Sequence, residues 1–128
     1  MSILLKNVRL ANEEELKDVA INEGTIVEIS NTVEGTFDKV IEGNGNVLIP
    51  GLVESHIHLD KALIASRKPN QSGTLQEAIK VTAELKPTFT EEDIYTRAKT
   101  TLDMIIPRGV TAIRTHAEFD PAQGFTGF

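Results

Sequence analysis

Two histidines one residue apart, His56 and His58, are the residues of this sequence whose type and spacing most directly suggest chemistry. They lie within residues 51–60, a stretch that is otherwise typical of a strand. Side chains of a strand alternate between its two faces, so both imidazoles are expected on one face. Neutral imidazole nitrogens bind divalent ions such as zinc, and two of them on one rigid strand favour a metal site. Two histidines alone could instead satisfy hydrogen bonds within a core or lie on an exposed edge.

A third histidine, His116, lies near the end of a second predicted strand, residues 110–118. If the two strands are neighbours in one parallel sheet, their polar ends converge at the carboxyl edge, which is where barrel enzymes place their catalytic residues. His116 is therefore a candidate metal ligand, a donor to a ligand, or a substrate contact, and the sequence does not separate these roles. Arg114, on the same predicted face, is expected to pair with an inward carboxylate.

The elements between these strands predict a crossover connection. After the strand at residues 52–60 comes a polar loop, residues 61–73, and then Thr74-x-x-Glu77, a capping box that opens a helix. Thr90-x-x-Asp93 opens a second helix in the same way. A strand, helices and a second strand make a βαβ unit, which predicts parallel strands and a sheet covered by helices.

Residues 1–50 show a different pattern. Short β-type runs separated by turn residues predict a small antiparallel β unit, with strands at residues 3–10, 19–22, 25–29, 39–41 and 47–49. Pro50-Gly51 marks a boundary, because proline cannot donate to a sheet ladder and glycine permits a sharp change of direction. The predicted domains are therefore residues 1–50 and residues 51–128.

The composition argues against several classes of partner. The 128 residues carry 19 acidic and 13 basic side chains, a net charge of −6 and no Lys/Arg-rich run, so we expect neither nucleic acid nor a membrane as a partner. No apolar run approaches the roughly 20 residues that cross a bilayer. Cysteine is absent, which excludes disulfides and thiolate metal ligands. Because the amino terminus also lacks a leader pattern, we expect a cytoplasmic location.

In combination these motifs resemble the amidohydrolase superfamily. Residues 50–60, PGLVESHIHLD, are similar to the first-strand signature of these metal-dependent barrel hydrolases. Glu54, together with residues 70–75 (NQSGTL) and 114–116 (RTH), is similar to cytosine deaminases and to related hydrolases of aminotriazines of the N-isopropylammelide type. The resemblance implies an α/β fold in which strands of a small β-sandwich domain precede the start of a (β/α)8 TIM-type barrel, incomplete within this chain.

The same resemblance implies a function and a site. It implies deamination, the hydrolysis of a C–N bond on a nitrogen heterocycle such as cytosine or an aminotriazine. One divalent ion, zinc or iron, would be bound by His56 and His58. The residues that would contact the small-molecule substrate are Leu75, His116, Asn70 and Gln71. The family's remaining ligands and its proton-transferring carboxylate lie on later strands, so we expect an N-terminal fragment without catalytic residues of its own that is inactive by itself.

Two alternatives stay open. The chain could be a non-catalytic interaction or assembly module, or it could belong to another barrel hydrolase with the same His-x-His start, such as a dihydropyrimidinase-like or phosphotriesterase-like enzyme. Asp60-Lys61 resembles the aminotriazine branch more than cytosine deaminase itself, which leaves the ring undetermined. We also expect a homo-oligomer.

Overall fold

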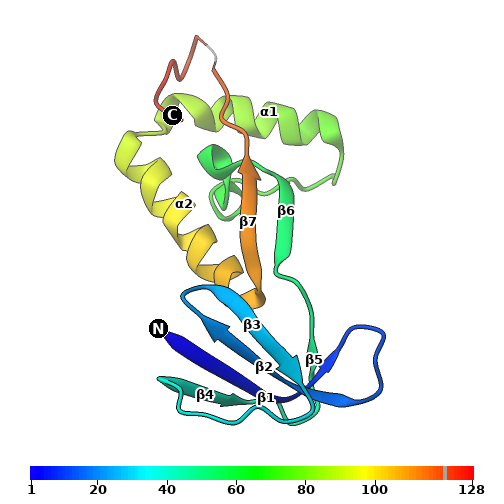
Figure 1. Cartoon of the computed structure of the whole chain (residues 1–128). Coiled ribbons are helices and arrows are strands. Elements are labelled where there is room, and N and C mark those ends of the chain that lie inside the picture. The colour runs from blue at the N-terminus through cyan, green and yellow to red at the C-terminus, as the bar shows by residue number, and fades with distance from the viewer. Residues whose placement is uncertain (120) are drawn as a thin grey trace. The chain divides into compact units, whose positions relative to one another are not determined.

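The computed structural model describes residues 1–119 and 121–128. The chain divides into two compact units, Met1–Pro50 and Gly51–Phe128 (Figure 1). Within the described residues, no helix combines the length and the apolar character that a membrane span requires.

The first unit is a five-stranded sheet built around β1 (Ser2–Leu10). β1 pairs antiparallel with β2 (Leu16–Asn22), and β2 pairs antiparallel with β3 (Thr25–Ser30). β4 (Lys39–Glu42) and β5 (Val47–Leu48) both run parallel to β1. The strands lie close to their predicted positions. The prediction of an antiparallel unit is wrong for β4 and β5, because both pair with β1 and run in the same direction as it does.

A small apolar core holds this sheet together. Leu4 and Ala20 are cross-strand partners of β1 and β2, and both are buried. Val33 is buried with them, and the half-buried ring of Phe37 packs against the cluster. Val33 and Phe37 follow β3, so the segment between β3 and β4 covers one face of the sheet and closes the core.

A buried aspartate stabilises an irregularity in this sheet. The register of β1 against β2 shifts between Leu5 and Val8, and Asn7 within that shift has a φ of 52°. Asp18 is 2% exposed, and its two carboxylate oxygens accept the backbone N–H groups of Asn7 (3.0 Å) and Val33 (3.1 Å). Because a bulge leaves backbone groups outside the ladder, Asp18 supplies the acceptor that Asn7 would otherwise lack.

In the second unit, β6 (Leu52–Ile57) and β7 (Val110–Thr115) run parallel and side by side (Figure 1). The chain between them forms α1 (Leu75–Leu85) and α2 (Glu91–Ile105). The predicted βαβ crossover is thereby confirmed. Parallel strands require such a connection, because a tight turn can join only antiparallel neighbours.

Both helices begin where the sequence predicts. The hydroxyl oxygen of Thr74 accepts the N–H of Glu77, and that of Thr90 accepts the N–H of Asp93. These threonines satisfy N–H groups that have no partner within the first helical turn. After α2, a proline-containing 3₁₀ turn (Ile106–Arg108) leads to Gly109, whose φ of 91° ends the helical stretch.

Both strands of the second unit end earlier than predicted. β6 stops at Ile57 rather than at residue 60, because Leu59–Lys61 form a 3₁₀ turn. β7 stops at Thr115 rather than at residue 118. His58 and His116 therefore each follow a strand directly.

The start of β6 depends on the absence of a side chain at Gly51. A Cβ atom built at that position would lie 2.1 Å from the Thr111 hydroxyl oxygen. The backbone of residue 51 and the side chain of Thr111 thus approach more closely than any other residue type would allow.

Candidate metal centre

Three imidazole rings converge at the carboxyl ends of β6 and β7. The ring centroids of His56 and His116 are 4.4 Å apart and stacked, and the ring of His58 is 5.4 Å from each. One nitrogen from each ring lies within 4.8 Å of the others. The sequence predicted that His56 and His58 share a face, and in the structure these rings lie together, with His116 beside them.

The strand ladder fixes this arrangement. The N–H of His116 donates to the carbonyl oxygen of Ile57 at 2.8 Å, so the two parallel segments stay paired up to the histidines. Between Glu54 and Ile57, β6 advances three residues while β7 advances only two, from Ile113 to Thr115. His56 lies within this bulge, which interrupts the strict alternation assumed from the sequence. Bulges of this kind redirect side chains next to functional sites.

His58 is placed for the neutral form that binds metal ions. Its side chain is 28% exposed. Burial lowers the pKa of the His58 imidazole below its ordinary value, and the Lys61 ammonium lowers this pKa further, while the Asp60 carboxylate acts in the opposite direction. A lowered pKa favours the neutral imidazole near pH 7, and only the neutral ring offers a lone pair to a cation.

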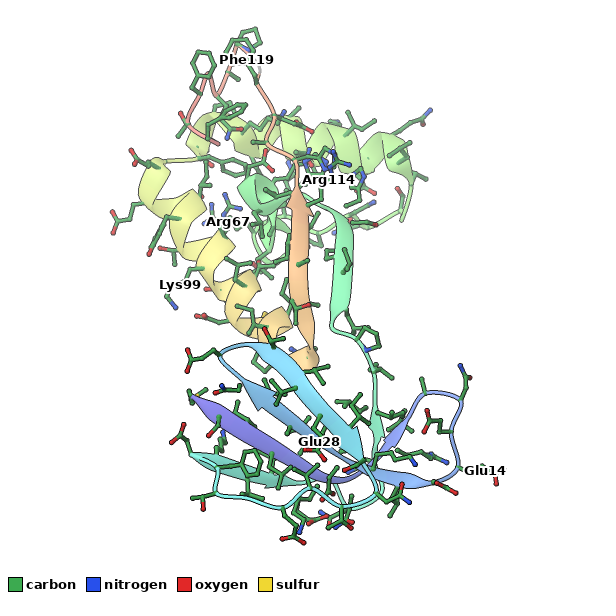
Figure 2. The ribbon with its side chains drawn as sticks, in the orientation of Figure 1. Glu14, Glu28, Arg67, Lys99, Arg114 and Phe119 are labelled. Carbon is green, nitrogen blue, oxygen red and sulfur yellow. The ribbon has the colours of Figure 1, made fainter. Side chains whose placement is uncertain are left out.

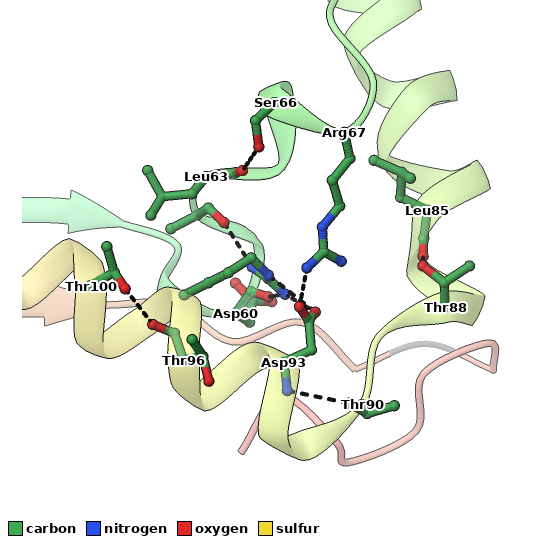
Figure 3. A network of polar contacts seen from close by, with 12 residues as sticks. Asp60, Leu63, Ser66, Arg67, Leu85, Thr88, Thr90, Asp93, Thr96 and Thr100 are labelled. Carbon is green, nitrogen blue, oxygen red and sulfur yellow. Dashed lines mark hydrogen bonds and ion pairs between the residues drawn. The ribbon is translucent and has the colours of Figure 1, made fainter.

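A buried arginine holds the turn that follows His58. Arg97 of α2 is 6% exposed, and its guanidinium donates to the carbonyl oxygens of Asp60 (3.0 Å) and Ala62 (2.7 Å). It also donates to the Asp93 carboxylate, from Nε at 3.1 Å and from Nη2 at 3.0 Å. Arg67 pairs with the same carboxylate, as Figure 3 shows. The 3₁₀ turn after β6 is therefore fastened to α2.

A second set of charges lies beside a small hollow. The Glu118 carboxylate pairs with both Lys61 and Lys86. Lys61, Lys86 and Glu118 line a hollow of about 300 Å³ together with Leu75, whose side chain is 75% exposed. Leu75, a predicted substrate contact, thus lies at a hollow in which none of the three histidines takes part.

The other predicted substrate contacts lie in different surroundings. His116 lines a larger hollow of about 1120 Å³, together with Tyr95 and Phe125. The amide of Asn70 bonds within its own loop, donating to the Thr74 carbonyl oxygen and accepting the Gly73 N–H. Asn70 and Gln71 line neither of these hollows. Of the four predicted contacts, His116 is the one whose ring lies beside those of His56 and His58.

Among the described residues, Arg114 lacks the ion pair that the sequence suggested. It is exposed near the end of β7 (Figure 2), and the part of the chain that the structure describes contains no ion-pair partner for it. The buried arginine of this unit is instead Arg97. Its spacing from Ile94 and Thr101, which are also buried, was the signal in the sequence, because residues at i, i+3 and i+7 share a helix face.

Comparison with known proteins places these motifs in a family. Residues 39–125 match the model of the amidohydrolase family. The chain is 27% identical over 123 residues to N-isopropylammelide isopropyl amidohydrolase from Pseudomonas sp. (strain ADP), an alignment that covers 92% of this chain and 30% of that protein. It is 35% identical over 81 residues to dihydroorotase from Bacillus cereus (strain G9842), covering 61% of this chain and 19% of the relative.

A solved structure shows the same relationship. The structure of 5-methylcytosine deaminase from Klebsiella pneumoniae liganded with phosphonocytosine superposes with a TM-score of 0.81 at 34% identity, covering 99% of this chain and 31% of that one. The chain thus spans less than a third of the length of each of these proteins. Since the family match covers well over half of the chain and includes His56, His58 and His116, the chain belongs to the amidohydrolase family.

Proposed function

We propose that this chain forms part of a metal-dependent hydrolase that deaminates a nitrogen heterocycle by cleaving a C–N bond. In this proposal residues 1–50 supply strands of a β-sandwich domain, and residues 51–128 supply the first βα units of a (β/α)8 barrel. The observation that carries it is the convergence of three imidazoles at the carboxyl ends of two parallel strands. The amidohydrolase match and the similarity to a 5-methylcytosine deaminase support the same reaction class.

The histidine cluster fits a divalent ion with little rearrangement. Two nitrogens bound to zinc at about 2.1 Å are at most about 4.2 Å apart. The nitrogens that His56 and His58 offer lie within 4.8 Å of each other, so small rotations of these two rings suffice to bring them into that range. Imidazole ligands suit both zinc and ferrous iron. We propose one such ion, bound by His56 and His58.

The chain's own residues would contact the substrate. When bound, the ion would supply Lewis acidity and lower the pKa of a water molecule. Of the three histidines, His116 alone lines the larger hollow, which supports a role in contacting the substrate ring. Leu75, Asn70 and Gln71 stay predicted contacts, and Asn70 would have to give up its bonds to the loop backbone in order to serve as one.

Metal binding is the first test. We expect the protein to bind about one equivalent of zinc, and His56→Ala/His58→Ala to lose that binding, because two imidazole ligands are removed. His116→Ala is the matched control, since it removes a third ring of the same cluster and should retain the ion. Bound zinc is measured by calorimetry and by metal analysis after dialysis. Equal zinc content in the wild type and the double variant would end the proposal.

A second candidate is hydrolysis of a cyclic amide, which the similarity to a dihydroorotase favours. The two reactions release different products. Deamination of cytosine or of an aminotriazine liberates ammonia, or an alkylamine where the amino group is alkylated, whereas opening of a cyclic amide generates a carboxylate and releases neither. An ammonia assay beside a ring-opening assay on the enzyme that carries this chain separates the candidates.

A further inference from the structure

Asp60, immediately after the paired histidines, is a buried carboxylate with one unsatisfied oxygen. The residue is 3% exposed. Its Oδ2 accepts the N–H of Glu118 at 3.0 Å. Its Oδ1 is buried without a hydrogen bond within the described residues and lies 3.5 Å from Nδ1 of His58, which is also buried and also without one. These two atoms face each other.

The position of this carboxylate is fixed from several sides. Arg97 holds the Asp60 carbonyl oxygen, so the backbone cannot turn away. Gly127 lies against the side chain, because a Cβ built there would be 3.3 Å from the Cβ of Asp60. Swinging the carboxylate into water would disrupt these contacts. A buried polar atom without a partner destabilises the fold, so the position of Oδ1 indicates a neighbouring group that makes use of it.

The chemistry of a ligating imidazole provides that group. A neutral imidazole carries its proton on one nitrogen and offers the lone pair of the other, and the acceptor next to the first nitrogen decides which is which. Histidines that bind metal ions commonly donate their second N–H to a carboxylate. With Nδ1 of His58 turned towards Asp60, Nε2 is the nitrogen left for a cation.

We propose that Asp60 is a positioning residue that keeps the proton of His58 on Nδ1 and so presents Nε2 to the divalent ion. This inference rests on the proposed function in taking His58 as a ligand. The present 3.5 Å separation is longer than a hydrogen bond, and ion binding is expected to shorten it to about 2.8–3.0 Å.

The same carboxylate links the two segments that carry the histidines. Oδ1 faces His58, while Oδ2 bonds to the backbone two residues beyond His116. Displacement of one segment relative to the other would strain one of these contacts. Asp60 therefore also sets the spacing between His58 and His116 in the folded chain.

Asp60→Asn is a sharp test, because asparagine keeps the size of the side chain and can still accept from Glu118. Its NH₂ group would then face His58 Nδ1 and donate to it, which favours the proton on Nε2 and blocks that nitrogen. We expect zinc affinity to fall 10- to 100-fold with an unchanged circular dichroism spectrum. In ¹⁵N-histidine NMR spectra, the His58 proton should move from Nδ1 to Nε2. Asp18→Asn, which alters the buried aspartate of the other unit, is the control.

Equal zinc affinity of the wild type and Asp60→Asn would overturn the inference. If Asp60→Asn does not fold, the wild type decides the matter, since its metal-free His58 must carry the proton on Nδ1, and the other tautomer would overturn the inference. Failure of the proposed function is distinguishable, because in that case the wild type itself binds no zinc through His56 and His58.

Discussion

Among the residues that the structure describes, each unit contains one deeply buried aspartate, and the two differ in how their oxygens are used. Asp18 of the first unit bonds through both oxygens to backbone N–H groups. Asp60 of the second unit bonds through one oxygen and turns the other towards a histidine. A fully bonded carboxylate secures backbone conformation, whereas a half-bonded one remains available to a neighbouring group. The comparison separates a structural acid from one that lies next to the candidate metal site.

The surroundings of the two aspartates support this distinction. Asp18 lies beside the core residues Val19 and Ala20, and its partners are the backbone of a bulge and of the segment after β3. Asp60 lies in a 3₁₀ turn that Arg97 fastens to α2. Substitutions in the first unit should therefore change stability alone, while those around Asp60 should change stability and metal affinity together.

Arg97→Met is expected to have the largest effect and tests whether stability and metal affinity change together around Asp60. The substitution keeps an unbranched side chain but removes the donors to the Asp60 and Ala62 carbonyl oxygens and leaves the Asp93 carboxylate with one partner fewer. We expect the free energy of unfolding to fall by about 3–5 kcal/mol and zinc affinity to fall with it. Urea unfolding and zinc calorimetry measure the two. Lys99→Met, an exposed position on the same helix, should change stability by less than about 0.5 kcal/mol. Full zinc affinity in a destabilised Arg97→Met would break the proposed coupling.

Asp18→Ala is the complementary variant, with a somewhat smaller effect. It leaves the N–H groups of Asn7 and Val33 without their acceptor, and relief from burying a charge offsets part of the loss. We expect the free energy of unfolding to fall by about 2–3 kcal/mol. Amide hydrogen exchange at Asn7 and Val33 should accelerate, while zinc affinity changes less than about twofold. Weakened zinc binding in this variant would show that the two aspartates are not separate in role.

The smallest expected effect is a change of stability with pH that depends on Asp93 of α2, the carboxylate that Arg97 shares with Arg67. The hydrogen bond from Arg67, with Arg97 adding to it, lowers the pKa of Asp93, so the folded-state value lies below the unfolded value of about 3.9. The stabilisation is complete above that value and is lost as the pH falls through the folded-state pKa.

Asp93→Asn should therefore reduce stability most above about pH 4, and the difference from the wild type should shrink at lower pH. Urea unfolding across this range measures the effect. The control is Asp103→Asn, whose side chain is 60% exposed. A difference between Asp93→Asn and the wild type that stays constant with pH would contradict the assignment.

Local signals in the sequence predicted the parts of the fold that depend on neighbours in the chain. The capping threonines Thr74 and Thr90 act where the pattern placed them, because a cap uses residues three positions apart. The crossover also followed from the sequence, since two strands separated by helices have few ways to pair. The parallel pairing of β4 and β5 with β1 did not, because it depends on contacts between residues far apart in the sequence.

The candidate site divides in the same way. His56 and His58 are local in sequence, and the strand pattern predicted that they share a face. The distances from these two histidines to His116 and Asp60 depend on two irregular features. One is the bulge between Glu54 and Ile57, and the other is the 3₁₀ turn Leu59–Lys61, where the sequence predicted strand. Neither feature has a clear local signal in the sequence. Arg97 was visible only as a charge on the apolar side of a helix. Its pairing with Asp93, four residues earlier, is local, but its two backbone acceptors lie more than thirty residues away and no spacing rule identifies them.

The bare backbone at Gly51 has an influence that reaches beyond its own turn. The Thr111 side chain occupies the space that a Cβ atom of residue 51 would need. The backbones of β6 and β7 are therefore close together at this point, five residues before His56. Even the methyl group of alanine at residue 51 would push β6 and β7 apart. We expect this separation to change the positions of the histidine rings at the other end of the two strands. We therefore expect the spacing of the histidines at the candidate metal site to depend in part on Gly51, which does not contact them.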